Sequence, residues 1–151
     1  MQKTDKHTSK MPNKLIIDSS VIVKWLNHTK EERLTQADKI IQDAEKDKVQ
    51  LLTTELAKYE TGNVFLFGKE LTTSEAKTSL ASLYTLPLRF IPQTEELAVE
   101  SYRIAKNTQN TFYDASFVAL AKQENATLVT DNPKHQAKIK GVKVVALEDY
   151  K

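Results

Sequence analysis

The chain has 151 residues, of which 40% are hydrophobic and 28% are charged, and its formal net charge is +2. These values are typical of one globular domain and argue against a low-complexity chain. The absence of cysteine excludes disulfides, thiol catalysis and thiolate metal sites. No apolar stretch approaches the ~20 residues of a membrane span, so we expect no membrane association and a cytoplasmic protein.

The first segments predict an extension, then a strand and two helices. Residues 1–13 are polar and are followed by no signal-like apolar stretch, so we expect a flexible extension. The apolar run 14–17 predicts a buried strand, and a helix is expected over 19–26. Thr29 and Glu32 have the spacing of a capping box, which predicts a helix over 30–46. Residues 49–52 predict a second strand.

A third helix is expected over residues 55–67. Four apolar residues recur on one stripe of it, which we expect to be buried: Leu56, Tyr59, Val64 and Phe67. Glu60 is four residues from both Leu56 and Val64, so the helical spacing places it on the same inward stripe.

Threonine caps mark the helices of the second half. Thr72 and Glu75 form a capping-box pair, Thr94 precedes a helix, and Thr111 opens the helix that contains Asp114. In the helix after Thr94 we expect four residues to face inward: Leu97, Ala98, Tyr102 and Ala105. Strands are predicted over 87–91, 127–130 and 142–146, with a short helical turn starting at 132–133.

Strands that alternate with helices predict an α/β sandwich with a mostly parallel sheet. The sequence contains no repeat, linker or shift in composition. We therefore expect one domain over residues 14–151, preceded by the extension 1–13.

Four acidic residues fall at informative positions. Asp18 and Asp131 follow predicted strands, while Glu60 and Asp114 lie on helix faces that should be buried. Buried carboxylates repel one another, and no inward Lys, Arg or His is evident from the pattern, so a bound cation is expected between them. Oxygen ligands without cysteine favour Mg²⁺ or Mn²⁺.

Each of these residues also has a structural explanation. Asp18 could cap the first helix, Asp114 has the capping-box spacing from Thr111, and Asp131 could cap the turn at Pro133. Glu60 could reach solvent. The sequence lacks a glycine-rich phosphate loop, and its three histidines are too scattered for a zinc site.

Four segments resemble the motifs of PIN-domain ribonucleases, and they occur in the family's order. They are Leu-Ile-Ile-Asp-Ser-Ser-Val-Ile-Val-Lys-Trp at 15–25, Tyr-Glu-Thr-Gly-Asn-Val at 59–64, Tyr-Asp-Ala-Ser-Phe-Val-Ala-Leu-Ala at 113–121, and Leu-Val-Thr-Asp-Asn at 128–132. The resemblance implies a three-layer α/β/α sandwich with a mostly parallel sheet of four to five strands. It also implies an acidic pocket for Mg²⁺ or Mn²⁺.

Small PIN proteins of this length are mostly VapC-type toxins, so the resemblance implies a metal-dependent endoribonuclease with a cognate antitoxin, usually a homodimer. The implied catalytic and metal-binding residues are Asp18, Glu60, Asp114 and Asp131. The family's last acid falls two residues after the threonine, which here is Asn132. The fourth ligand is therefore Asp131, Asn132 or a water held by either.

Other residues have expected roles in such a site, and two alternative functions remain beside the ribonuclease hypothesis. Ser19 and Thr130 are expected to orient ligands, and Lys24, Lys134 and Lys138 are candidate phosphate contacts. One alternative is a PIN-fold module that binds RNA or protein without cleavage, because its metal site is degraded. The other is a metal-dependent phosphatase that acts on small phosphoesters.

Overall fold

The structure is a computed structural model that describes residues 11–134, 136 and 139–151. Most of the predicted extension, residues 1–10, lies outside the described residues, as does Lys138. The first strand begins at Asn13, one residue before the expected domain boundary. Within the described residues, no helix is long and apolar enough to cross a membrane.

Five strands form a single sheet in the order β3-β2-β1-β4-β5, and every neighbouring pair is parallel. The strands are β1 Asn13–Ile17, β2 Val49–Thr54, β3 Leu88–Ile91, β4 Thr127–Thr130 and β5 Val144–Ala146. Leu15, Ile16 and Ile17 are all buried, as expected for a central strand covered on both faces. The predicted parallel sheet is confirmed.

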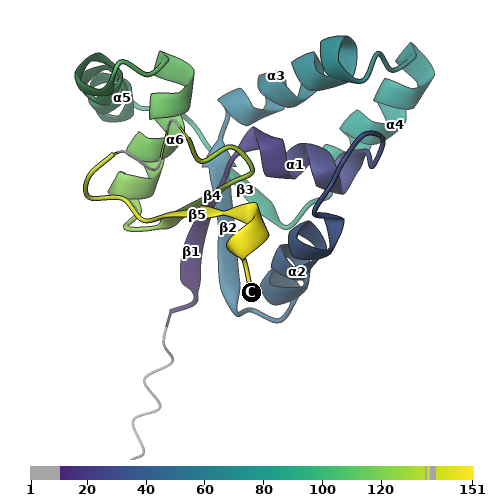
Figure 1. Ribbon diagram of the computed structural model, residues 1–151, viewed down its shortest axis with the longest axis horizontal. Coiled ribbons are helices and arrows are strands. Elements are labelled where there is room, and N and C mark those ends of the chain that lie inside the picture. Colours follow the sequence, from purple (N-terminus) through teal and green to yellow (C-terminus); the bar gives the residue numbers. More distant parts are fainter. Residues whose placement is uncertain (1–10, 135, 137–138) are drawn as a thin grey trace, which may run out of the picture.

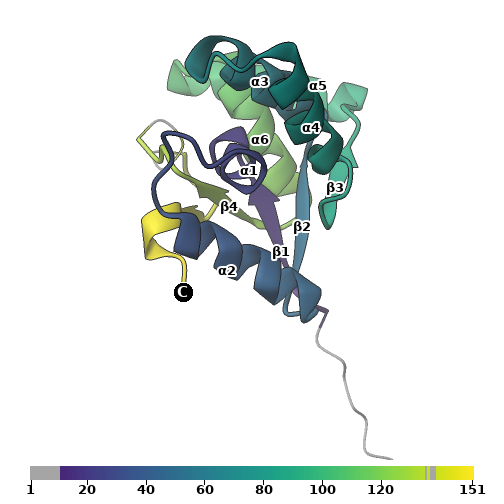
Figure 2. The same cartoon turned by 90° about the vertical axis from the view of Figure 1, so that its right-hand side faces the viewer.

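Six α-helices cover the two faces of the sheet, which gives the expected three layers (Figures 1 and 2). They are α1 Ser19–Leu26, α2 Leu34–Glu45, α3 Leu56–Asn63, α4 Thr73–Leu83, α5 Glu95–Thr108 and α6 Phe112–Gln123. A π-helical turn, η1 Val64–Gly68, continues α3, and a 3₁₀ turn, η2 Leu147–Asp149, follows β5. In Figure 1, α5 and α6 lie on one side of the strands and α1 and α2 on the other.

The strand order places a topological switch point beside β1. The chain moves from β1 outward to β2 and β3, and then returns to pair β4 with the opposite edge of β1. Ile17 is in register with Val129, so Asp18 and the residues after Thr130 leave the sheet side by side. Open parallel sheets bind ligands at such a point, because the helices that follow the two strands diverge to opposite faces.

The capping box predicted at Thr29 is wrong, whereas the one at Thr72 is confirmed. The α2 helix begins at Leu34, and its N-cap residue Arg33 makes no side-chain capping bond. The carbonyls of Thr29 and Glu32 instead accept hydrogen bonds from the side chains of Lys69 and Lys24. Tertiary contacts therefore hold this segment out of the helix that its local pattern predicts.

The predicted inward stripe of α3 is also partly wrong. Tyr59 is 76% exposed and Phe67 is 75% exposed, while Ala57, Thr61 and Phe65 are buried. Small residues on the buried face allow α3 to pack closely on its neighbours α1 and β2. The same correction applies in α5, where Tyr102 is exposed and its buried residues are Leu97, Ser101 and Ile104.

Candidate metal centre

A cavity of about 700 Å³ opens at the switch point. It is bordered by the ends of β1 and β4 and by residues of α3 and α6. All five residues that the sequence singled out as metal ligands line it: Asp18, Glu60, Asp114, Asp131 and Asn132. The fold therefore gathers side chains that are up to 114 positions apart in the sequence, from Asp18 to Asn132, into one acidic site.

Asp18 serves both as a helix cap and as a wall of the cavity. It is the N-cap residue of α1, and its Oδ2 accepts hydrogen bonds from the backbone N–H of Ser20 at 3.3 Å and from the Ser20 hydroxyl at 2.5 Å. The Thr130 hydroxyl donates to the same oxygen at 3.1 Å. Burial raises the pKa of Asp18, these donors lower it, and the charge of Asp114 raises it further.

Glu60 points into the same cavity from α3. Its Oε1 accepts a hydrogen bond from the Ser19 hydroxyl at 2.8 Å. Burial raises the pKa of Glu60, and the Ser19 hydrogen bond opposes this effect. The charges of Asp18 and Asp114 raise the pKa further, so the three carboxylates act on one another electrostatically.

Asp114 completes this group from the first turn of α6. Its backbone N–H donates to the side chain of Thr111, the N-cap residue, at 3.1 Å. The carboxylate is free of the reciprocal capping-box bond in the contacts described for α6. A carboxylate in the first turn is stabilised by the positive end of the helix dipole.

The donor set fits a hard divalent cation. Asp18, Glu60 and Asp114 offer carboxylate oxygens, and none of them forms an ion pair with a described residue. Among the described residues, no three acidic or histidine side chains lie close enough together to hold a metal ion as they stand. A bound cation would reduce the repulsion between these carboxylates.

Asp131 differs from the other three acids because it is paired with two cations. Its Oδ2 lies 3.1 Å from Lys24 Nζ, and its Oδ1 lies 3.2 Å from Arg33 Nη1. The expectation that no cationic side chain turns inward is therefore wrong, since Lys24 and Lys69 are both buried. Of the candidate phosphate contacts, Lys24 is buried and does not line the cavity, whereas Lys134 is exposed and lines it.

Two further polar residues of the site, Ser20 and Gln136, were not predicted from the sequence. Ser20 links Asp18 to the β4 end, because its hydroxyl accepts from the backbone N–H of Asp131 at 3.0 Å. Gln136 lines the cavity and is buried, and its Oε1 has no hydrogen-bond partner among the described residues. The Asp18-x-Ser20 spacing of an Asx-type turn could have indicated Ser20, but no pattern marks Gln136.

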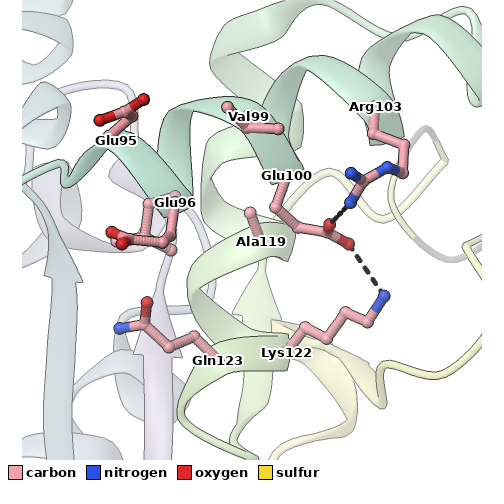
Figure 3. Close-up of a pocket in the computed structure, with 9 residues that line it drawn as sticks. Glu95, Glu96, Val99, Glu100, Arg103, Ala119, Lys122 and Gln123 are labelled. Atoms are coloured by element: carbon pink, nitrogen blue, oxygen red, sulfur yellow. Dashed lines mark hydrogen bonds and ion pairs between the residues drawn. The ribbon is translucent and has the colours of Figure 1, made fainter.

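A second open cavity of about 620 Å³ lies between α5 and α6 (Figure 3). Its wall includes several acidic residues, but Glu100 is already paired with both Arg103 and Lys122. The hydrogen bond from Lys122 holds the pKa of Glu100 below its usual value, and burial partly opposes this. The charge of Glu100 is therefore compensated within the protein, unlike that of the carboxylates at the switch point.

The model of the PIN domain family matches residues 15–141. No curated protein sequence matches the chain. Among solved structures, the chain is similar to PAE2754 from Pyrobaculum aerophilum, with 22% identity, a TM-score of 0.65, and coverage of 97% of this chain and 94% of that one. It is also similar to a toxin-antitoxin complex from Klebsiella pneumoniae, with 19% identity, a TM-score of 0.63, and coverage of 88% and 97%.

A third similar structure is VapC20 from Mycobacterium tuberculosis, described as a sarcin-ricin loop cleaving toxin. It is 16% identical, with a TM-score of 0.60, and the match covers 85% of this chain and 98% of that one. At these identities the structural likeness establishes a shared fold over nearly whole domains.

Proposed function

The chain belongs to the PIN domain family, and on that premise we propose that it is a metal-dependent endoribonuclease that hydrolyses phosphodiester bonds of RNA. The observation that carries the proposal is the convergence of Asp18, Glu60 and Asp114 on one cavity at the switch point, where each lacks a cationic partner among the described residues. Carboxylates in this state bind a divalent cation and suit chemistry on phosphate.

These three residues would hold Mg²⁺ or Mn²⁺, and the fourth oxygen would come from Asp131, Asn132 or a water molecule. When bound, the ion supplies a water of lowered pKa and stabilises negative charge on the reacting phosphate. The protein supplies the orientation of the carboxylates, because Ser20 and Thr130 donate to Asp18. Lys134, exposed at the cavity, is placed to contact a backbone phosphate.

We further propose that the protein is the toxin of a toxin-antitoxin pair and forms a homodimer in the cytoplasm. Its likeness to the Klebsiella pneumoniae toxin-antitoxin complex and to VapC20 supports this proposal. Exposed aromatic side chains, of the kind enriched at protein interfaces, offer contact surface for such partners: Tyr59, Phe67, Tyr84, Tyr102 and Tyr113. Growth arrest on expression, relieved by the product of the neighbouring gene, would support the assignment.

The decisive experiment is cleavage of RNA by the full chain with Mg²⁺ or Mn²⁺. Asp18→Asn and Asp114→Asn should each reduce the rate by roughly 100-fold or more, because each removes an anionic ligand. Asp38→Asn, which removes an exposed carboxylate on α2, is the matched control and should cleave like the wild type.

Undiminished cleavage in the two site variants, or in excess EDTA, would refute the proposal. RNA binding without cleavage by the wild type would favour the non-cleaving binding module. Turnover of a chromogenic phosphate monoester in place of RNA would favour the phosphatase.

A further inference from the structure

A buried lysine lies beside the acidic cavity. The side chain of Lys24, in α1, is 2% exposed. Its Nζ lies 3.1 Å from Asp131 Oδ2 and 3.2 Å from Glu31 Oε2, and it donates a hydrogen bond to the carbonyl of Glu32 at 2.8 Å. A buried ammonium group is stable only when oxygens replace its water. Three oxygens do so here, and one of them belongs to a predicted metal ligand.

Arg33 holds the other oxygen of the same carboxylate. Its Nη1 donates to Asp131 Oδ1 at 3.2 Å, while Lys24 holds Oδ2. Arg33 itself has a left-handed backbone with φ of 56° immediately before α2. Asp131 therefore connects α1 with the segment that precedes α2. We call the group of Lys24, Arg33 and Asp131 the clasp.

The clasp separates Asp131 from the other acids of the cavity. The charge of Asp131 is balanced by two cations of the protein, whereas Asp18, Glu60 and Asp114 form no ion pair with a described residue. A metal ion that used this carboxylate would compete with Lys24 and Arg33 for its oxygens.

The main chain of Asp131 connects the clasp to Asp18. The Asp131 N–H donates to the Ser20 hydroxyl at 3.0 Å, and that hydroxyl donates to Asp18 Oδ2. Thr130, the preceding residue, donates to the same oxygen of Asp18 at 3.1 Å and accepts from the backbone N–H of Asn132. The position of residues 130–132 thus determines the orientation of the Asp18 carboxylate.

We propose that Asp131 is a positioning residue and not a metal ligand. The clasp holds the turn after β4 against α1 in both the free and the metal-bound protein, so that Ser20 and Thr130 keep Asp18 oriented. The divalent cation is held by Asp18, Glu60 and Asp114, and Asn132 or water supplies any further oxygen. The metal part of this inference rests on the proposed function.

Titration of the full chain with Mn²⁺ in a calorimeter tests the ligand assignment without requiring activity. Asp131→Asn keeps the backbone N–H that donates to Ser20 and an amide oxygen for one of the two cations, so its Kd for Mn²⁺ should stay within about threefold of the wild type. Asp18→Asn should weaken Mn²⁺ binding by about tenfold or more, and Asp38→Asn should leave it unchanged. An equal loss of affinity in Asp131→Asn and Asp18→Asn would overturn the inference.

Thermal unfolding of the same proteins tests the clasp itself. Lys24→Met leaves Arg33 as the remaining cation for Asp131 and Lys69 as the remaining cation for Glu31, and it should lower Tm by roughly 10 °C. The double variant Lys24→Met, Asp131→Asn should lose less than the sum of the two single losses, with the same coupling in the presence of Mn²⁺. Additive losses would show that the clasp does not exist in solution.

The two experiments separate the possible failures. If the wild type binds no Mn²⁺, the proposed function and the metal part of this inference both fail, while the coupling of Lys24 to Asp131 still decides whether the clasp forms. If the coupling disappears when Mn²⁺ is added, the ion has displaced the cations and Asp131 is a ligand after all.

Discussion

The hydroxyl of Ser19 donates a hydrogen bond to Glu60 Oε1 over 2.8 Å, which joins the first turn of α1 to the carboxylate of α3. The two residues are 41 positions apart, and the contact exists only because α3 packs on α1. Ser19 follows Asp18 directly, so a single short segment orients two of the three unpaired carboxylates: Asp18 through Ser20, and Glu60 through Ser19.

Removal of this hydroxyl should raise the pKa of Glu60. In the metal-free protein, burial and the charges of Asp18 and Asp114 raise that pKa, and only the Ser19 hydrogen bond lowers it. Ser19→Ala should therefore shift the Glu60 titration to higher pH, and Ser19→Thr should restore it. Carboxyl NMR titration provides the measurement, and an unchanged Glu60 pKa in Ser19→Ala would contradict the geometry.

Stability in acid should depend on Asp43. Hydrogen bonds from Lys39 and Tyr150 lower the pKa of Asp43. A lowered folded-state pKa contributes stability that is present above the ordinary value of 3.8 and is lost as pH falls through the folded value.

Asp43→Asn should thus lose about 1 kcal/mol of stability at neutral pH, and its stability should fall less steeply than that of the wild type as pH drops below about 4. Urea unfolding at a series of pH values measures both effects. If the free energies of unfolding of the variant and the wild type depended on pH in the same way, the lowered pKa of Asp43 would not contribute to stability. Asp38→Asn, on the exposed face of α2, is the control.

Truncation of two phenylalanines in the π-helical turn should affect the stability of the protein very differently. Phe65 is 1% exposed and Phe67 is 75% exposed. Phe65→Ala should destabilise the protein by about 3–5 kcal/mol, because it leaves a cavity in the core, whereas Phe67→Ala should change stability by less than about 0.5 kcal/mol. Chemical denaturation of both variants measures the contrast, and similar losses would place Phe67 in a buried environment instead.

Two Thr-x-x-Glu segments with the same local pattern should also differ. Thr72 accepts from the N–H of Glu75, and Glu75 accepts from the N–H of Thr72, so Thr72→Ala should cost about 1 kcal/mol. Thr29 makes no capping box, so Thr29→Ala should leave stability within about 0.5 kcal/mol of the wild type. A comparable loss at Thr29 would mean that its segment forms the predicted helix in solution.

Local chemistry explains why most of the elements could be predicted. The caps at Thr94 and Thr111 depend on a side chain and a backbone N–H three residues apart, which the sequence alone shows. The strands β1 and β4 are short apolar runs buried on both faces. Burial within helices was predicted less well, because Tyr59 and Tyr102 lie on faces that no described segment of the chain covers.

The helix predicted after Thr29 failed for a different reason. Lys24 and Lys69 are buried, and each needs carbonyl oxygens to replace water. They obtain them from Asn27, Thr29 and Glu32, that is, from residues just before the predicted helix and from its first turn. Long-range electrostatic demands thus outweighed a local preference of about 1 kcal/mol.

The sequence by itself determined which elements form, that the sheet is parallel, and which acids stand at strand ends or on helix faces. These properties depend on residue type and spacing along the chain. Only the tertiary structure decided which of those acids carry cationic partners. Asp131 acquires Lys24 from α1 and Arg33 from the residue before α2, while Asp18, Glu60 and Asp114 line one cavity at the switch point without an ion pair to a described residue. Distances between charges set these interactions, and distances are fixed only when the helices pack on the sheet.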